Sequence, residues 1–267
     1  MARRRADAAL VEAGLFASRE QAKAAILAGR VTLLGAGPVL KAGGDVPDDA
    51  VFEVESGPEF VSRGGVKLAG ALEAFGLNVA GMRAIDVGAS TGGFTDCLLQ
   101  RGVVAVTALD VGYGQLAWKL RCDERVTVLE RTNIRNVDPD ALAGAPFDLA
   151  VIDVSFIGLG KVLPHVLPLL RDGGEVVALV KPQFEAGKAR VGKRGVVRDA
   201  AVHTDVLETV TREAADAGFA VTDATWSPIT GPEGNIEFWM RLVIGGVPAE
   251  IDYAALVVAA HASVGGR

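Results

Sequence analysis

The spacing of hydrophobic positions changes near residue 60, so the chain is expected to fold as two parts. In the first part, Ser18 with Gln21 three residues later forms a capping-box pattern that begins a helix, and Gly29 ends it. The pattern predicts helices over residues 6–12 and 19–28 and strands over 31–34 and 51–54. This part is therefore predicted to be a small α+β domain.

In the second part, strand patterns and helix patterns alternate regularly. Helices are expected over residues 66–75, 93–101, 116–120, 159–170 and 201–217, and strands over 84–87, 103–110, 126–129, 149–153, 175–180, 220–225 and 237–243. This alternation predicts an α/β fold with a mostly parallel seven-stranded sheet and helices on both faces. The last two strands have no helix between them, so they are expected to form an antiparallel edge.

Composition narrows the class of protein. The 267 residues suffice for a medium domain and a small one, and 50% hydrophobic residues exclude a disordered chain. The two cysteines, Cys97 and Cys122, make neither a disulfide framework nor a metal cluster, so no metal is expected. The sequence has no secretory signal and no apolar run near the ~18 residues of a membrane span, so a cytoplasmic location is expected.

The positions of the positive residues point to a different kind of partner than the net charge does. A net charge of −6 argues against a nucleic-acid-binding protein, but positive residues form two clusters. The clusters consist of Arg3, Arg4, Arg5, Arg19, Lys23 and Arg30, and of Lys181, Lys188, Arg190, Lys193, Arg194 and Arg198. Either cluster alone is compatible with an ordinary solvated surface. Two of them on an acidic protein favour a cationic track for a polyanion.

A strand followed by a glycine-rich turn and a helix marks a candidate cofactor site. Its expected contacts are Asp86, Gly88, Ala89, Ser90, Thr91, Gly92 and Gly93. Ser90 stands where a dinucleotide-binding turn requires glycine, which disfavours NAD. Ribose, adenine and an amino-acid tail fit better, so S-adenosylmethionine is the expected cofactor, with Asp86 near its ammonium and Asp110 at its ribose. Asn133 and Asp153 follow the next strands and are expected in the same crevice, although a purely structural turn and strand-end caps remain alternatives.

Charged residues at strand ends suggest the chemistry. Lys181 directly follows a hydrophobic strand, so its amine must be paired, lowered in pKa or directed into a cleft. Asp153, at the end of another strand, is the expected partner. Lys67 lies on the preceding helix and Glu237 opens the last strand, so four charged residues are expected near one crevice. A structural salt-bridge network would give the same pattern.

Two resemblances extend these predictions. Residues 3–55, with Leu10-Val11-x-x-Gly14 and Ser18-Arg19-x-x-Ala22-x-x-x-Ile26-x-x-Gly29-Arg30-Val31, resemble the S4 RNA-binding domain. Nearly the whole chain resembles the TlyA family of ribosomal RNA cytidine 2′-O-methyltransferases, historically described as haemolysins. The motifs that carry this resemblance are Ser62-Arg63-Gly64-Gly65-x-Lys67-Leu68, Asp86-x-Gly88-Ala89-Ser90-Thr91-Gly92-Gly93-Phe94-Thr95, Asp110-Val111-Gly112-Tyr113-Gly114-Gln115-Leu116, Asp153-Val154-Ser155-Phe156-Ile157, Lys181-Pro182-Gln183-Phe184-Glu185 and Gly231-Pro232-x-Gly234-Asn235-x-Glu237.

The resemblance implies a Rossmann-like class I methyltransferase domain over residues 65–267, a linker over 58–64 and an S4-like RNA-binding domain over 1–57. It implies ribosomal RNA within ribosomal subunits as partner and a catalytic tetrad of Lys67, Asp153, Lys181 and Glu237. Lys181 in its neutral form is then expected to be the general base. The linker departs from the actinobacterial family's pattern Arg-x-Trp-Val, because the matching stretch reads Pro58-Glu59-Phe60-Val61 and lacks the arginine.

Three alternatives stay open at this point. A base methyltransferase usually needs an Asn/Asp-Pro-Pro-aromatic motif or a nucleophilic cysteine, and Asp153-Val154-Ser155-Phe156 lacks the prolines. A pore-forming haemolysin would need a membrane-active segment. A non-catalytic RNA-binding protein would keep the S4-like surface without needing Lys181 or Asp153.

Overall fold

The computed structural model describes residues 3–264, and for Lys193 the backbone alone. The chain divides into two compact units, residues 1–59 and 60–267, and the division falls inside the segment expected to link two domains. Among the described residues, no helix has the length and apolar composition of a membrane span.

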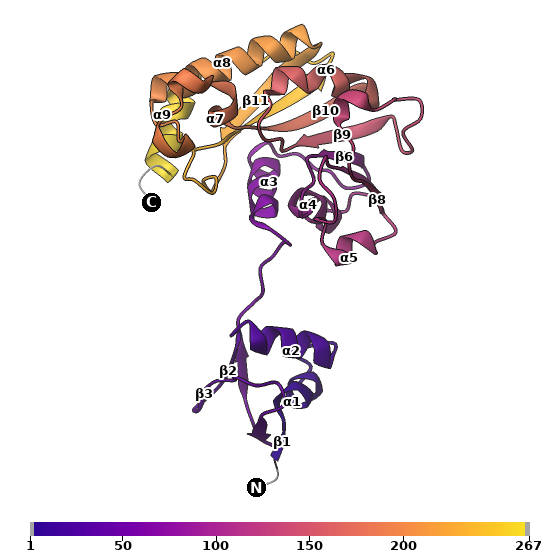
Figure 1. Cartoon of the computed structure of the whole chain (residues 1–267), viewed down its shortest axis with the longest axis vertical. Helices are drawn as coiled ribbons and strands as arrows, with labels where there is room; N and C mark the ends of the chain where they lie inside the picture. Colours follow the sequence, from indigo (N-terminus) through magenta and orange to yellow (C-terminus); the bar gives the residue numbers. More distant parts are fainter. Residues whose placement is uncertain (1–2, 265–267) are drawn as a thin grey trace. The chain divides into compact units, whose positions relative to one another are not determined.

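The first unit packs two helices beside short strands (Figure 1). The helices are α1 (Ala6–Glu12) and α2 (Arg19–Leu27), and the strands are β1 (Arg3–Arg5), β2 (Val31–Leu33), β3 (Gly37–Pro38), β4 (Asp45–Pro47) and β5 (Phe52–Val54). Strand β1 pairs with β4, and β3, β2 and β5 form a second antiparallel sheet. The predicted cap is present, because Ser18 Oγ accepts a hydrogen bond from the Gln21 N–H at 3.3 Å.

The second unit is a seven-stranded sheet in the order β11-β12-β10-β9-β6-β7-β8. Its strands are β6 (Arg83–Val87), β7 (Ala105–Leu109), β8 (Val126–Leu129), β9 (Phe147–Ile152), β10 (Leu170–Val180), β11 (Phe219–Trp226) and β12 (Phe238–Ile244). Strands β6 to β10 run parallel, and β12 is antiparallel to both β10 and β11. The predicted α/β fold with an antiparallel edge is therefore confirmed.

Helices cover both faces of this sheet (Figure 1). On one face lie α3 (Arg63–Ala74), α4 (Gly93–Gln100) and α5 (Trp118–Arg121); on the other lie α6 (Leu163–Val166), α8 (Ala200–Asp216) and α9 (Tyr253–Val264). Side chains along β10 alternate between the two cores: Val176 and Ala178 belong to one, and Val177 and Leu179 to the other. The sheet is thus buried on both sides, as its continuous hydrophobic strands require.

The helices of the second unit differ from the prediction in three places. The continuous helix expected over residues 159–170 is instead α6 between two 3-10 turns, because Pro164 and Pro168 each remove a backbone N–H from a helical ladder. Helix α9 was not predicted, and it carries apolar residues on exposed as well as buried positions, such as Val258 and Val257. Helix α3 begins three residues earlier than expected, at Arg63, because Ser62 Oγ caps the Gly64 N–H.

Candidate active site

The glycine-rich turn joins β6 to α4 and brings two strand ends into contact. Gly88 has a φ of +91°, and a Cβ atom there would lie 2.3 Å from the carbonyl oxygen of Asp153. Only glycine therefore allows the ends of β6 and β9 to approach this closely. Gly92 also has a positive φ, +92°, and faces the side chains of Leu116 and Leu120.

A cleft of about 360 Å³ opens beside this turn at the carboxyl ends of the strands. Its lining consists of Ser62, Arg63, Gly64, Lys67, Gly88, Ala89, Ser90, Thr91, Gly93, Phe94, Asp153 and Pro232. A second, much smaller hollow shares Ala89 and Ser90 with it and extends past Asp110 to Leu116 and Val128. The turn is thus bordered by a cleft of mixed polarity on one side and a mostly apolar slot on the other, which suits an elongated ligand.

Asp110, at the end of β7, lies against the turn as expected. Its Oδ2 accepts a hydrogen bond from the Ser90 N–H at 2.8 Å, and its Oδ1 accepts one from the Gly112 N–H at 2.6 Å. These bonds fix the carboxylate in the slot and leave each oxygen a further lone pair for a ligand hydroxyl.

Asp86, in β6 before the turn, is fully buried and lines neither of the two hollows. Its Oδ2 accepts hydrogen bonds from the Thr95 N–H and hydroxyl, at 3.0 and 2.7 Å, whereas its Oδ1 has no partner among the described residues. Burial raises the pKa of this carboxyl to about 7, against the hydrogen bonds from Thr95. A buried acceptor without a partner is rare and costly, so it needs a donor from outside the chain or a proton of its own.

Two oppositely charged pairs come together at the cleft. Lys67 Nζ lies 2.5 Å from Glu237 Oε2, and Lys181 is ion-paired with Asp153. Burial raises the pKa of Glu237, while Lys67 and then Lys181 act to lower it. All four charges are therefore close enough to act on one another, and Lys67 and Asp153 line the cleft directly.

Sequence reasoning missed an aromatic pair beside Lys181. Phe156 is 90% exposed, has a φ of +67°, and its ring centroid lies 5.0 Å from that of Phe184. Lys181 Nζ lies 3.1 Å from Ser155 Oγ and 5.9 Å from the Phe184 ring. A large apolar side chain that is exposed and in the left-handed region is unusual, and such strain is concentrated at functional sites. The exposure could not be predicted from the motif letters alone.

Asn235 was quoted only as part of a motif, and the structure places it at a junction. Its side chain accepts a hydrogen bond from the Val197 N–H at 3.0 Å and donates one to the Gly195 carbonyl at 2.9 Å. These bonds tie the basic segment before α8 to the residues that lead into Glu237. Asn133, by contrast, lines neither hollow and caps the turn at Ile134–Asn136, so its role at the cofactor stays a prediction.

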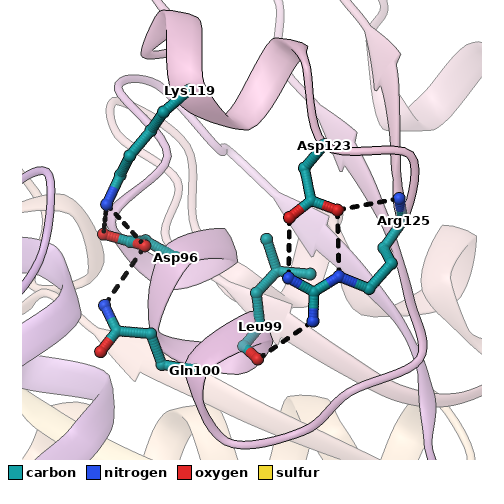
Figure 2. Close-up of polar contacts among 6 residues, drawn as sticks. All are labelled: Asp96, Leu99, Gln100, Lys119, Asp123 and Arg125. Carbon is teal, nitrogen blue, oxygen red and sulfur yellow. Dashed lines mark hydrogen bonds and ion pairs between the residues drawn. The ribbon is translucent and has the colours of Figure 1, made fainter. Parts of the chain in front are cut away.

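Helix α4 is held in place by polar contacts with the segment after β7 (Figure 2). Asp96, in its first turn, accepts hydrogen bonds from Lys119 Nζ at 2.9 Å and from the Val61 N–H at 2.8 Å. Arg125 reaches from the start of β8 to Asp123 and to the Leu99 carbonyl. The glycine turn therefore leads into a helix whose position is fixed at both ends.

The basic residues differ in how far they are already paired. In the first unit, Arg4 pairs with Glu12, while Arg5 and Arg19 both pair with Asp7, which holds the pKa of that carboxyl well below its usual value. Arg3 and Lys23 are exposed and Arg30 is half-buried.

In the second cluster, Arg190 pairs with Asp205, and Lys188 and Arg194 are exposed. The side chain of Lys193 lies outside the described residues. Within the described part of the chain, no group of His, Cys, Asp and Glu is arranged to hold a metal ion.

Known proteins are similar to this chain in sequence and fold. Residues 60–243 match the family model of the FtsJ-like methyltransferases. The chain is 49% identical to the 16S/23S rRNA (cytidine-2′-O)-methyltransferase TlyA of Mycobacterium tuberculosis over 90% of this chain and 91% of that protein. It is 39% identical to Hemolysin A of Brachyspira hyodysenteriae over 86% of this chain and 96% of that protein. A solved structure from Streptococcus thermophilus, provisionally named a hemolysin, has a TM-score of 0.76 and 44% identity, covering 100% of this chain and 98% of that one.

Proposed function

The chain belongs to the TlyA family of FtsJ-like methyltransferases, and on that premise we propose that it methylates the ribose 2′-oxygen of a cytidine in ribosomal RNA, with S-adenosylmethionine as methyl donor. The 16S RNA is the first candidate substrate and the 23S RNA the second, after the name of the mycobacterial relative. The observation that carries the proposal is the meeting of the Lys67–Glu237 and Lys181–Asp153 pairs beside the glycine turn.

The residues around the turn fit the cofactor. The unpartnered Asp86 Oδ1 is suited to a positively charged amino group, and Asp110 to ribose hydroxyls. The slot beyond Ser90, with Leu116 and Val128 in its walls, is suited to a flat base. When bound, S-adenosylmethionine would supply a methyl group on a sulfonium sulfur, a strong electrophile that needs no metal.

Lys181 is the proposed general base. A ribose hydroxyl is a very weak acid, so its proton must leave as the oxygen attacks, and a nearby amine in its neutral form can accept it. Asp153 is paired with this amine and lines the cleft, so it orients Lys181 toward the reacting oxygen. Lys67 lines the same cleft and the buried Glu237 holds its ammonium there, so the pair supplies a fixed positive charge that can hold the ribose.

The basic and aromatic surfaces would bind the RNA. A target cytidine must leave its stack to bring its ribose to the methyl group, and the exposed ring of Phe156 offers a face for the displaced base. Lys188 and Arg194 are exposed, and we propose that they contact phosphates that flank the target. We also propose that the first unit, with its arginines, acts as an S4-like RNA-binding domain.

The test is transfer of label from methyl-labelled S-adenosylmethionine to isolated 30S and 50S ribosomal subunits. Label is expected with the natural protein, and Lys181→Met is expected to reduce the rate by about 10²–10⁴. A non-catalytic RNA-binding protein would bind the subunits and transfer nothing, and it would show no binding of the cofactor by calorimetry. Absence of label transfer by the natural protein, or absence of cofactor binding, would overturn the proposal.

A further inference from the structure

Two segments lie against each other next to the cleft. Residues 153–159 follow β9 and residues 181–185 follow β10, the parallel neighbour of β9. Four contacts join them in sequence order: the Asp153–Lys181 ion pair, the Ser155–Lys181 hydrogen bond, the Phe156–Phe184 ring contact and a hydrogen bond between Leu159 and Glu185. The first three involve the proposed base or the proposed RNA-binding ring, whereas the fourth involves neither.

The fourth contact is a close one. Glu185 Oε1 accepts a hydrogen bond from the Leu159 N–H at 2.9 Å. A Cβ atom at Gly158 would lie 2.8 Å from Glu185 Oε2, so the carboxylate packs directly against the backbone of the loop. Burial raises the pKa of Glu185 to about 7, Glu213 on α8 raises it further, and the Leu159 N–H opposes this shift. Even a partly buried carboxylate costs free energy to keep, and Glu185 belongs neither to the four charged residues at the cleft nor to its lining.

Glu185 holds the loop of residues 153–159, whose backbone is strained at Phe156. Phe156 stands in the left-handed region at a φ of +67°, with 90% of its side chain exposed. Such a conformation persists only where neighbouring contacts fix the backbone on both sides. Before Phe156 the fixing contact is Ser155 with Lys181, and after it the fixing contact is Leu159 with Glu185.

We propose that Glu185 is a positioning residue for methyl transfer: by holding the Leu159 N–H it keeps Phe156 and Ser155 in register with Lys181. The inference rests on the proposed function. Glu185 acts through the loop and touches none of the reacting atoms, so its loss should impair use of the RNA and leave cofactor binding intact.

The first experiment compares Glu185→Ala with Glu185→Gln, using 30S subunits and saturating S-adenosylmethionine. The alanine variant is expected to lose about tenfold in kcat/KM, the effect of removing one charge-assisted hydrogen bond, with the cofactor Kd unchanged. The glutamine variant keeps an acceptor of the same length and is expected to recover most of that loss. Asp216→Asn, which removes an exposed acidic charge at the end of α8, is the matched control and is expected to behave as the natural protein.

A second variant approaches the same contact from the loop. Gly158→Ala should displace the Glu185 carboxylate, give the same loss in kcat/KM, and add little to Glu185→Ala in the double variant. The pH profile is a further readout. Protonated Glu185 is a neutral acceptor, as glutamine is, so kcat/KM of the natural protein should fall below about pH 7 by no more than the small loss of Glu185→Gln, and Glu185→Gln should lack this step.

The outcomes separate the inference from its premise. If the natural protein methylates ribose and Glu185→Ala matches it, or if glutamine is as damaging as alanine, the positioning role is wrong. The positioning role is also wrong if a drop in melting temperature accounts for the whole loss of kcat/KM in Glu185→Ala while Gly158→Ala is fully active. If the natural protein transfers no methyl group, the proposed function itself is wrong.

Discussion

Lys67 Nζ lies 2.5 Å from Glu237 Oε2 although 170 positions separate the two residues in the sequence. Both are almost completely buried, at 7% and 1% exposure. Removing one partner of a buried ion pair leaves an uncompensated charge, which costs about 3–5 kcal/mol. Lys67→Met is therefore expected to lower the free energy of unfolding by about 3 kcal/mol in urea denaturation, with most of that loss recovered in Lys67→Met/Glu237→Gln.

The same pair predicts a pH dependence. Burial raises the pKa of Glu237 above its ordinary value of 4.5, and Lys67 opposes the shift. An acid whose pKa is raised by folding binds more protons in the folded state, so its contribution to stability falls as pH rises above the unfolded value. Without Lys67 the pKa rises further, so the deficit of Lys67→Met should be larger at about pH 8 than at about pH 5. An equal deficit at both values would contradict the buried pairing.

Asp86 predicts how cofactor affinity should respond to pH. Burial raises the pKa of this carboxyl to about 7, so its charge appears only as pH rises through that value. If Asp86 faces the amino group of S-adenosylmethionine, the Kd from calorimetry should decrease as pH rises through about 7. Asp86→Asn should bind more weakly at high pH and lose this dependence. A pH-independent Kd in the natural protein would remove Asp86 from the cofactor site.

The close contact at Gly88 predicts that the single methyl group of an alanine there is enough to damage the proposed cofactor site. A Cβ atom there would lie 2.3 Å from a backbone oxygen of Asp153, in addition to the strain of a positive φ. Gly88→Ala is expected to weaken S-adenosylmethionine binding at least about tenfold, because the turn must move. Gly76→Ala is the matched control, since Gly76 also has a positive φ, +56°, with nothing within 4 Å of its Cβ position. Equal effects of the two variants on affinity would show that only backbone strain matters.

The pairing of Asp7 with two arginines gives a test of the proposed RNA binding by the first unit. Its carboxylate lies 2.9 Å from an Arg5 nitrogen and 3.0 Å from an Arg19 nitrogen, while both arginine side chains remain about half exposed. Two guanidinium groups held on one carboxylate are prearranged for a phosphate. Asp7→Asn should therefore weaken binding to 30S subunits, although it removes a negative charge. Asp49→Asn makes the same charge change on an exposed residue of the same unit and should leave affinity equal or tighter. Tighter binding by Asp7→Asn would mean that net charge alone decides.

The sequence was enough to predict which charged residues gather at the carboxyl ends of the parallel strands. Asp86, Asp110, Asp153 and Lys181 were placed together because parallel strands connected by right-handed crossovers end at one edge of the sheet. The hydrogen bond of Glu185 to the Leu159 N–H, 26 residues away, has no periodic signature and could not be foreseen.

Other features were missed for different physical reasons. The prediction of a helix over residues 159–170 relied on hydrophobic spacing and gave too little weight to Pro164 and Pro168. The pairing of Arg5 and Arg19 with Asp7 depends on how the first helices pack, so the sequence showed a basic cluster but not which of its members were already bound.

The position of the transferred methyl group tests the proposed chemistry most directly. After 30S and 50S subunits are incubated with the protein and methyl-labelled S-adenosylmethionine, the RNA is digested to nucleosides and analysed by mass spectrometry. The label is expected in 2′-O-methylcytidine, and it should appear there about 10²–10⁴ more slowly when Lys181→Met is used. Label on a cytosine base, with every ribose unmodified, would contradict the role of Lys181 and Asp153 as a base and its orienting partner.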